Sequence, residues 1–171
     1  MGRRHADHLG VDCLVLVWVA SFQQEMRVSD KAIEMLCHHE GVRRKPYQDC
    51  IGLWTVGVGH LIGKTLPPEW NRTLTLKEVY ALLKKDVTKF EAGVCRLCPV
   101  GLTGGRFDAL VSFAFNTGLG CLQRSSIRMK HNRGDFEGAA NGFLLYTKAA
   151  GKVFRGLVTR RKDERAVYLG A

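Results

Sequence analysis

The sequence has no uninterrupted apolar run of the roughly 20 residues that a stable membrane-spanning helix requires, no internal repeat and no low-complexity tract. With 46% hydrophobic and 25% charged residues, the composition lies near the average for globular proteins and argues against a multi-span membrane protein and a disordered chain. A length of 171 residues fits one domain that can bury a core without disulfides or a metal.

Cysteine is too infrequent for a small disulfide scaffold, since the chain holds six. Cys95 and Cys98 form one C-x2-C pair, but no second pair and no histidine follows at zinc-finger spacing, so we expect no metal. In an oxidising compartment Cys121 could pair with Cys95 or Cys98, whereas in a reducing compartment we expect all six to remain thiols.

Acidic residues are scarce relative to basic ones: 16 Asp and Glu stand against 26 Lys and Arg, for a net charge of +10. This excess indicates a polyanionic partner, and both nucleic acid and the anionic bacterial cell envelope fit. Basic clusters such as residues 43–45 and 160–162 lack a zinc-finger, homeodomain or RNA-recognition signature. We therefore expect no specific nucleic-acid partner.

Residues 1–28 form a distinct leader that begins with basic residues and continues with the mostly apolar segment 9–22. This is the order of a signal peptide, but Asp12 interrupts the apolar run and Trp18 replaces the small residue that cleavage needs. We expect a membrane-targeting segment that associates transiently with the inner membrane through residues 9–22. A leader without an export role is the alternative.

Residues 29–171 are expected to form one α+β domain. Ser29 is a suitable N-cap for a helix whose apolar positions end at Glu40, where Gly41 favours a stop. Glycine and β-branched residues over 46–62 predict a small hairpin sheet, closed by the prolines at 67 and 68. Helices are then predicted from Thr75 through Phe90, from Thr103 to Gly118, over 135–146 and over about 157–169. The order predicts a small sheet lobe beside a larger helical lobe.

Three polar residues converge where the first helix gives way to the sheet: Glu40, Asp49 and Thr55. Cleavage of a glycosidic bond needs one carboxyl group that donates a proton and one that stays ionised. Glu40 ends an apolar helix face, so we expect desolvation to keep it protonated, while Asp49 in a polar turn stays ionised. Taken singly, each residue also fits a structural role at a helix end, in a turn or in a strand.

The spacing of these residues resembles that of the phage-type lysozymes, whose active sites follow E-x8-D-x5-T and then G-x-G-H. The resemblance is carried by IEMLCHHEGVRRKPYQDCIGLWTVGVGHL, LTGGRFDALVSFAFNTGLG, GDFEGAANGF and GLVTRRKDERAVYL, and so covers about residues 31–169. It implies a monomeric lysozyme-like muramidase of bacterial peptidoglycan that works without a cofactor. Glu40 would protonate the leaving oxygen while Asp49 and Thr55 hold the attacking water, with carboxyl groups about 6.5 to 9.5 Å apart in an inverting site.

The resemblance also assigns residues around this triad. Leu61, Phe115 and Asn116 correspond to positions that line a substrate cleft, although core packing explains Phe115 equally well. His60 corresponds to a structural histidine that ties the lobes together through a carboxylate. One of Arg160 and Arg161 would pair with Glu40, or both would belong to a solvated basic face.

Three cysteines depart from the simplest family members: Cys13 in the leader, Cys37 one helical turn before Glu40, and Cys50 beside Asp49. Some endolysins with releasable membrane anchors are held inactive by a disulfide near the catalytic residues. The similarity implies a regulatory disulfide here, either between Cys37 and Cys50 or through Cys13. Such an enzyme would be made in the host cytoplasm, be tethered to the membrane, and act in the periplasm or on the cell wall.

Two other functions compete with hydrolysis. A lytic transglycosylase cuts the same bond but closes a 1,6-anhydro ring, a reaction that needs the glutamate and not the water clamp, so Asp49 and Thr55 count against it. A lysozyme-like binding protein without turnover would lack part of the triad, which is complete in this sequence.

Overall fold

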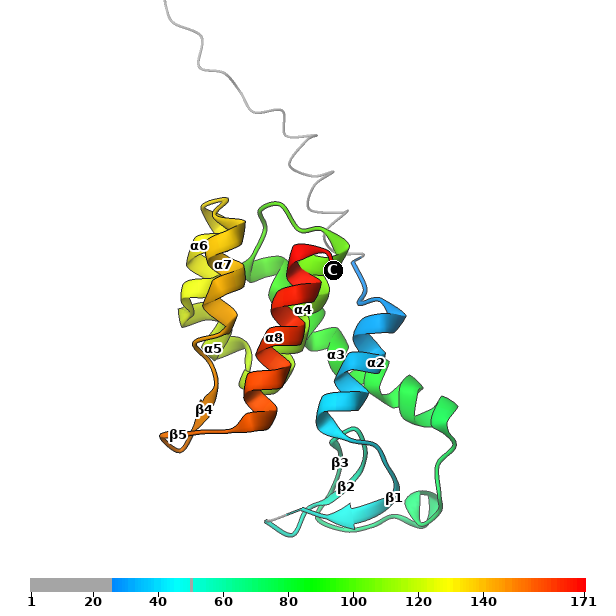
Figure 1. Cartoon of the computed structure of the whole chain (residues 1–171). Helices are drawn as coiled ribbons and strands as arrows, with labels where there is room; N and C mark the ends of the chain where they lie inside the picture. Colours follow the sequence, from blue (N-terminus) through cyan, green and yellow to red (C-terminus); the bar gives the residue numbers. More distant parts are fainter. Residues whose placement is uncertain (1–25, 50) are drawn as a thin grey trace, which may run out of the picture.

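The computed structural model describes residues 26–49 and 51–171 of the chain. A three-stranded antiparallel sheet lies at one end, and the helices gather above it (Figure 1). The α+β class predicted from the sequence is confirmed. No helix in the described part of the chain combines the length and apolar character needed to cross a membrane. Residues 1–25, which carry the predicted membrane-targeting segment, lie outside the described residues.

The first described helix, α2 (Asp30–Glu40), begins and ends where the sequence predicts. The Ser29 hydroxyl accepts a hydrogen bond from the Ala32 N–H and so caps the helix. Gly41 has a φ of 78°, a conformation that favours glycine, and its N–H bonds the Cys37 carbonyl. The chain therefore leaves the helix directly after Glu40.

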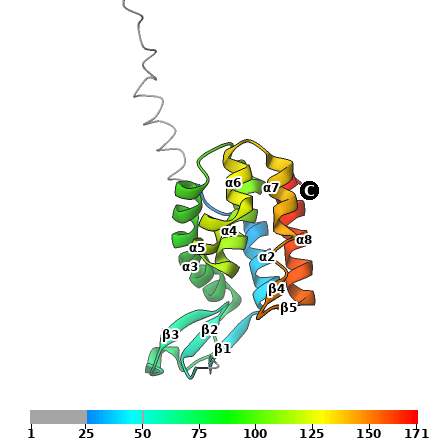
Figure 2. The ribbon, with the colours of Figure 1, turned by 90° about the vertical axis from the view of Figure 1, so that its left-hand side faces the viewer.

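The sheet lobe comprises β1 (Arg43–Gln48), β2 (Trp54–Gly57) and β3 (His60–Gly63), in that order across the sheet. Thr55 pairs with Tyr47 of β1 and with Leu61 of β3. A 3-10 helix, η1 (Pro68–Trp70), follows and leads to the next long helix. The turned view places this lobe below the helices (Figure 2).

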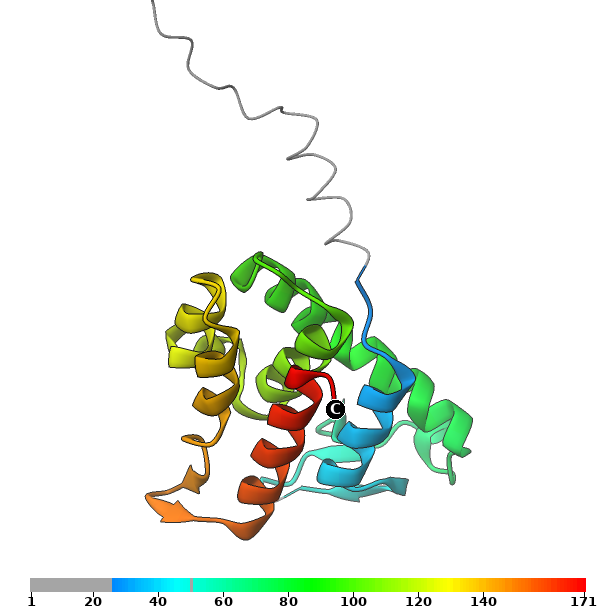
Figure 3. The ribbon, with the colours of Figure 1, turned by 45° about the horizontal axis from the view of Figure 1, so that its top comes forward.

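The helical lobe starts with α3 (Leu76–Leu97), which carries the capping box predicted at Thr75 and Glu78. The other helices are α4 (Gly104–Thr117), α5 (Leu119–Arg124), α6 (Ser126–Asn132), α7 (Phe136–Phe143) and α8 (Arg155–Leu169). A short hairpin of β4 (Lys148–Ala149) and β5 (Lys152–Val153) joins α7 to α8 (Figure 3). The predicted helix over 135–146 is shorter than expected, while α5, α6 and this hairpin were not predicted.

Helix α4 is the centre of the core, since all its residues from Phe107 to Ala114 are buried. A helix that is buried on every side must be packed around by others, and α3, α5 and α8 all contact it. Residues before α2 also contact this lobe: the Val28 N–H donates to Glu91 Oε1 at 2.9 Å. The division between leader and domain at residue 28 stays a prediction, although residues 26–28 already touch the domain.

An aromatic cluster around Phe113 joins α4 to α7 and α8. The buried Phe113 ring lies 5.5 Å from Phe143 and 4.9 Å from Tyr146 between ring centroids, and the Arg161 guanidinium lies 5.0 Å above it. We expect Phe113→Ala to lower the free energy of unfolding by about 3 to 5 kcal/mol, because the cavity loses these contacts. Guanidinium denaturation followed by tryptophan fluorescence measures the change. Phe113→Leu fills most of the space and should lose less; an equal loss in both variants would contradict the cavity explanation.

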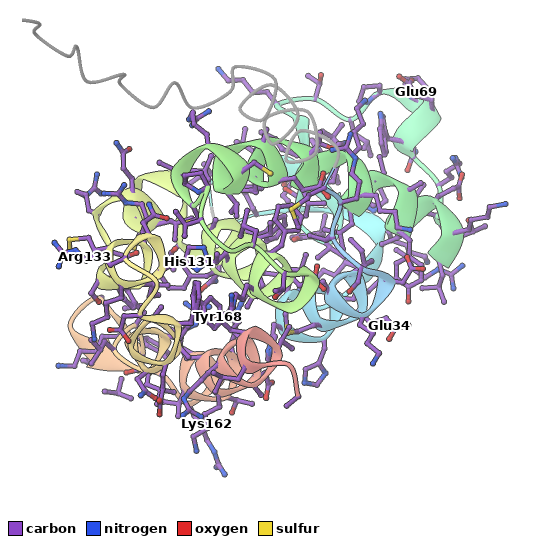
Figure 4. All side chains as sticks on the ribbon, turned by 90° about the horizontal axis from the view of Figure 1, so that it is seen from above. Glu34, Glu69, His131, Arg133, Lys162 and Tyr168 are labelled. Carbon is purple, nitrogen blue, oxygen red and sulfur yellow. The ribbon has the colours of Figure 1, made fainter. Side chains whose placement is uncertain are left out.

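His131 lies in the interior of the helical lobe beside Tyr168 (Figure 4), with 2.5 Å between its Nδ1 and the tyrosine hydroxyl. Burial lowers the pKa of His131, and burial likewise lowers the pKa of His39. The unfolded chain therefore binds protons near pH 6.5 that the folded chain rejects. We expect the free energy of unfolding to fall as the pH drops from 7.5 to 5.5. Urea denaturation across this range tests the expectation, and an unchanged slope in His131→Gln would show that His131 does not contribute.

Candidate functional site

Glu40 lies at the end of α2, on the same side of the helix as Ile33, Leu36 and Cys37, which are buried in the core. The sequence predicted apolar surroundings for the Glu40 carboxyl group, and this expectation is wrong. Its side chain is 30% exposed, and its Oε1 accepts a hydrogen bond from Arg160 Nη1 at 2.5 Å. The apolar stripe of α2 predicted that Glu40, at its last position, would be surrounded by apolar side chains. Instead, the carboxylate at the helix end points towards α8.

A pocket of about 410 Å³ opens in front of Glu40, between the sheet lobe and the helical lobe. Three residues that the sequence assigned to substrate binding, Leu61, Phe115 and Asn116, line it. Phe115 also packs on Phe90, with 5.2 Å between ring centroids, so it serves both the core and the pocket. The complete lining consists of Glu40, Val58, Gly59, His60, Leu61, Asp86, Lys89, Phe90, Phe115 and Asn116.

A second pocket, of about 610 Å³, extends from Glu40 towards the β4–β5 hairpin. It shares Glu40 and Asn116 with the first pocket, and Phe154, Leu157 and Arg160 are among its other lining residues. Glu40 therefore stands between two adjoining hollows. This arrangement suits an extended chain-like ligand that passes the carboxylate on both sides, more than a compact small molecule.

Asp49 and Thr55 lie on the hairpin between β1 and β2. Asp49 Oδ1 accepts hydrogen bonds from the N–H groups of Ile51 and Leu53, at 3.0 and 2.9 Å, which fixes the carboxylate in the turn. Asp49 Oδ2 makes no hydrogen bond to a residue that the structure describes. The buried Thr55 hydroxyl donates to the Leu53 carbonyl at 3.4 Å, a long contact. Both residues lie outside the lining of the two pockets described above.

His60 links the two lobes. Its Nδ1 lies 2.8 Å from Asp86 Oδ2, so β3 is tied to α3, and its ring stacks on Trp70 with 5.4 Å between centroids. Both side chains of the ion pair are mostly buried. Asp86 is the carboxylate partner that the sequence could not name, because the two residues are 26 positions apart.

Breaking this link should destabilise the protein. We expect Asp86→Asn to lower the free energy of unfolding by about 1 to 2 kcal/mol, since the partly buried hydrogen bond from His60 loses its charged acceptor. Asp30→Asn is a matched control, because Asp30 pairs with Lys84 at 2.8 Å at an exposed position and should contribute almost nothing. Chemical denaturation at pH 7 compares the two variants, and equal losses would show that the lobe link has no special weight.

The two arginines have different roles that the sequence left open. Arg160 pairs with Glu40, while Arg161 donates from Nη2 to Asn116 Oδ1 at 3.1 Å. Both side chains are buried, so the alternative of a solvated basic face is wrong. Sequence reasoning missed Glu164, which contacts both guanidinium groups. Glu164 lies three residues after Arg161 and four residues after Arg160. Residues at this spacing share a helix face, so the sequence could have indicated these contacts.

The cysteines give no disulfide at the predicted places within the described residues. Cys98 and Cys121 are thiols, which is the predicted alternative to a disulfide between Cys121 and Cys95 or Cys98, and burial raises the pKa of Cys98 to about 12. Cys37 is a buried thiol whose pKa burial also raises. Cys13 and Cys50, the other members of the proposed regulatory disulfide, lie outside the described residues. No group of three or more His, Cys, Asp or Glu side chains in the described part could hold a metal ion.

Comparison with known proteins gives consistent matches to one family. The profile of the phage lysozyme family matches residues 37–164. An endolysin of Bacillus phage B103 is 39% identical over 146 residues, 84% of this chain and 54% of the relative. A SAR-endolysin of bacteriophage PS119 is 40% identical over 130 residues, 76% of each chain. The crystal structure of a P22 lysozyme mutant superposes with a TM-score of 0.76 and 33% identity, covering 85% of this chain and 99% of that one.

The extent of these matches differs between relatives. The chain spans about half the length of the Bacillus phage endolysin, but nearly all of the P22 lysozyme. The superposition on the P22 lysozyme confirms the lysozyme-like fold predicted from the sequence.

Proposed function

Because the chain belongs to the phage lysozyme family, we propose that it is a peptidoglycan-degrading glycosidase, a muramidase. It hydrolyses the β-1,4 bond between N-acetylmuramic acid and N-acetylglucosamine, with inversion at the anomeric carbon, and its activity lyses bacterial cells. The proposed catalytic residues are Glu40, Asp49 and Thr55.

The observation that carries this proposal is the position of Glu40 between two adjoining pockets. Arg160 holds Oε1 of the carboxyl group, and Oε2 has no hydrogen-bond partner among the described residues. Oε2 is therefore the oxygen that can approach the glycosidic oxygen of a glycan strand lying in both pockets. A proton on this atom passes to the leaving group as the bond to the anomeric carbon breaks.

Asp49 and Thr55 supply the water in this mechanism. The backbone bonds to Asp49 Oδ1 orient the carboxylate, and Oδ2 can accept a proton from the attacking water. Among the residues that the structure describes, the Thr55 hydroxyl makes only a long bond to Leu53, so it can turn to hold the same water. The water attacks the anomeric carbon from the face opposite to the leaving oxygen, which inverts the configuration.

The charge of the chain supports a cell-wall substrate. A net charge of +10 attracts the protein to the anionic envelope, because stem-peptide carboxylates and envelope phosphates are negative. We also propose that the enzyme is a monomer, that it needs no cofactor and that it has no specific nucleic-acid partner.

The leader, residues 1–28, provides a way for the enzyme to reach the cell wall. The relationship to a SAR-endolysin supports transient tethering to the inner membrane through residues 9–22. The enzyme is then made in the host cytoplasm and acts in the periplasm or on the cell wall. Redox control through Cys13, Cys37 and Cys50 is part of this hypothesis, and dithiothreitol should change the rate or the electrophoretic mobility of exported enzyme if it is correct.

The test that separates hydrolysis from transglycosylation is the chemistry of the product ends. Purified peptidoglycan is digested with the protein, and the muropeptides are identified by mass spectrometry. Hydrolysis gives reducing N-acetylmuramic acid ends, whereas a transglycosylase leaves 1,6-anhydro ends that are 18 mass units lighter because no water is added. A predominance of anhydro products would overturn the muramidase assignment.

A further inference from the structure

Glu164 is a fully buried carboxylate on α8 that the proposed mechanism does not use. Its Oε1 accepts hydrogen bonds from Ser112 Oγ at 2.8 Å, Arg161 Nη2 at 2.9 Å and Arg160 Nε at 3.1 Å. Its Oε2 lies 2.8 Å from Arg161 Nε. One carboxylate therefore fixes two guanidinium groups at the contact between α8 and α4, two helices that lie side by side (Figure 1).

Each of the two arginines reaches a different residue of the site. Arg160 contacts Glu40 through Nη1 and donates from Nη2 to the Ser112 carbonyl at 3.1 Å. Arg161 holds the side chain of Asn116. Because Glu40 and Asn116 line both pockets, Glu164 is linked to the centre of the site through two short chains of hydrogen bonds.

Burying these charged groups between two helices carries a large desolvation penalty. Burial raises the pKa of Glu164, and the guanidinium groups of Arg161 and Arg160 counteract this effect. Guanidinium groups keep their protons in proteins, so charge remains inside the core. Apolar residues of similar volume usually stabilise a helix contact as well as buried ion pairs do. The contact between Arg160 and Glu40 therefore explains the presence of this charged cluster better than helix packing does.

We propose that Glu164 is a positioning residue for the proposed glycosidase reaction: it holds the Arg160 guanidinium against Glu40 and supplies a negative charge that balances one of the two arginines. The inference rests on the proposed function, since it concerns the acid of that reaction. Without Glu164, Arg160 and Arg161 would lose the carboxylate that they share, and Arg160 would lose the Nε bond that orients it towards Glu40. Positive charge that is not balanced by a nearby anion opposes the protonation of a carboxyl group, and the proposed reaction needs a proton on its acid.

Several elements contribute titratable or charged groups to these surroundings. Helix α4 adds the neutral Ser112 and Asn116. The titratable or charged groups are His38, His39 and Glu40 of α2, His60 of β3, Asp86 and Lys89 of α3, Cys121 of α5, and Arg160, Arg161, Asp163 and Glu164 of α8.

The test compares Glu164→Gln with the parent and with Glu137→Gln. Glutamine keeps an oxygen acceptor for Arg160 and Ser112 but removes the charge, and Glu137 is an exposed residue of α7 from which the same charge is removed. We expect the alkaline limb of the pH–rate profile of Glu164→Gln to move to lower pH by about one unit. At a pH on that limb kcat then falls about tenfold, while KM stays within about twofold. Glu137→Gln should keep the parental profile.

The outcomes separate this inference from the proposed function. A folded Glu164→Gln with the parental profile and kcat would overturn the inference, whatever its thermal stability. If Glu164→Gln does not fold, Arg160→Lys replaces it, because a lysine keeps the charge near Glu40 but cannot bridge Glu40 and Glu164. A parental kcat and profile in that variant would also overturn the inference. Full activity of Glu40→Gln would instead overturn the proposed function.

Discussion

Replacing Glu40 by glutamine should abolish nearly all glycan hydrolysis, with kcat lowered by about 10² to 10⁴. Glutamine preserves the shape of the side chain and an oxygen that can accept the Arg160 bond, so the pocket is retained. It cannot, however, give a proton to the leaving oxygen. The rate is measured as the release of reducing ends from purified peptidoglycan at several substrate concentrations.

Two controls separate lost chemistry from lost structure. The circular dichroism spectrum and the melting temperature of Glu40→Gln should match those of the parent, because its environment is partly exposed and its contacts are preserved. The variant should also sediment with insoluble peptidoglycan as the parent does. Release of reducing ends at the parental rate would remove Glu40 from the mechanism, and with it the assignment of the site.

Replacing Asp49 by asparagine should lower kcat by about 10² or more, again with little effect on the fold. Asparagine retains Oδ1, which accepts the hydrogen bonds from Ile51 and Leu53 that shape the turn. The amide nitrogen that takes the place of Oδ2 cannot accept a proton from water. The expected loss therefore reports on activation of the water and not on the hairpin.

Thr55→Val is the companion variant for the water site. Valine preserves the branched shape of threonine at this buried strand position and replaces the hydroxyl with a methyl group. We expect a smaller loss of kcat than in Asp49→Asn, since the hydroxyl positions the water and does not take its proton. Steady-state kinetics on the same peptidoglycan compares the two variants. An Asp49→Asn enzyme that retains more than half of the parental kcat would argue against the water clamp and favour the transglycosylase alternative.

Local features of the fold could be predicted because they depend on neighbouring residues. Ser29 and Thr75 begin helices by accepting a hydrogen bond from the N–H three residues later, and Gly41 ends α2 because it adopts a positive φ without strain. These signals operate within one helical turn, so they can be read from a single segment. The short helices α5 and α6 and the β4–β5 hairpin were missed because each is too short for a clear hydrophobic period.

The triad Glu40, Asp49 and Thr55 could also be identified from sequence, because the three residues lie within 16 positions and follow one helix–hairpin unit. The environment of Glu40 could not be identified in this way. A helix stripe predicts which face is buried, but not which distant group meets the end of that face. Arg160 is 120 positions away, and only the packing of α8 against α4 brings it to Glu40.

The class of the fold, the ends of the principal helices and the spacing of the proposed catalytic residues follow from the amino-acid sequence alone, because they rest on short-range backbone and side-chain preferences. The packed helices were needed to show that Arg160 and not Arg161 holds Glu40, that Asp86 ties His60 across the lobes, and that Glu164 contacts both arginines in the core. These contacts join residues on different elements or orient neighbours on one helix, and their partners depend on how the helices pack together.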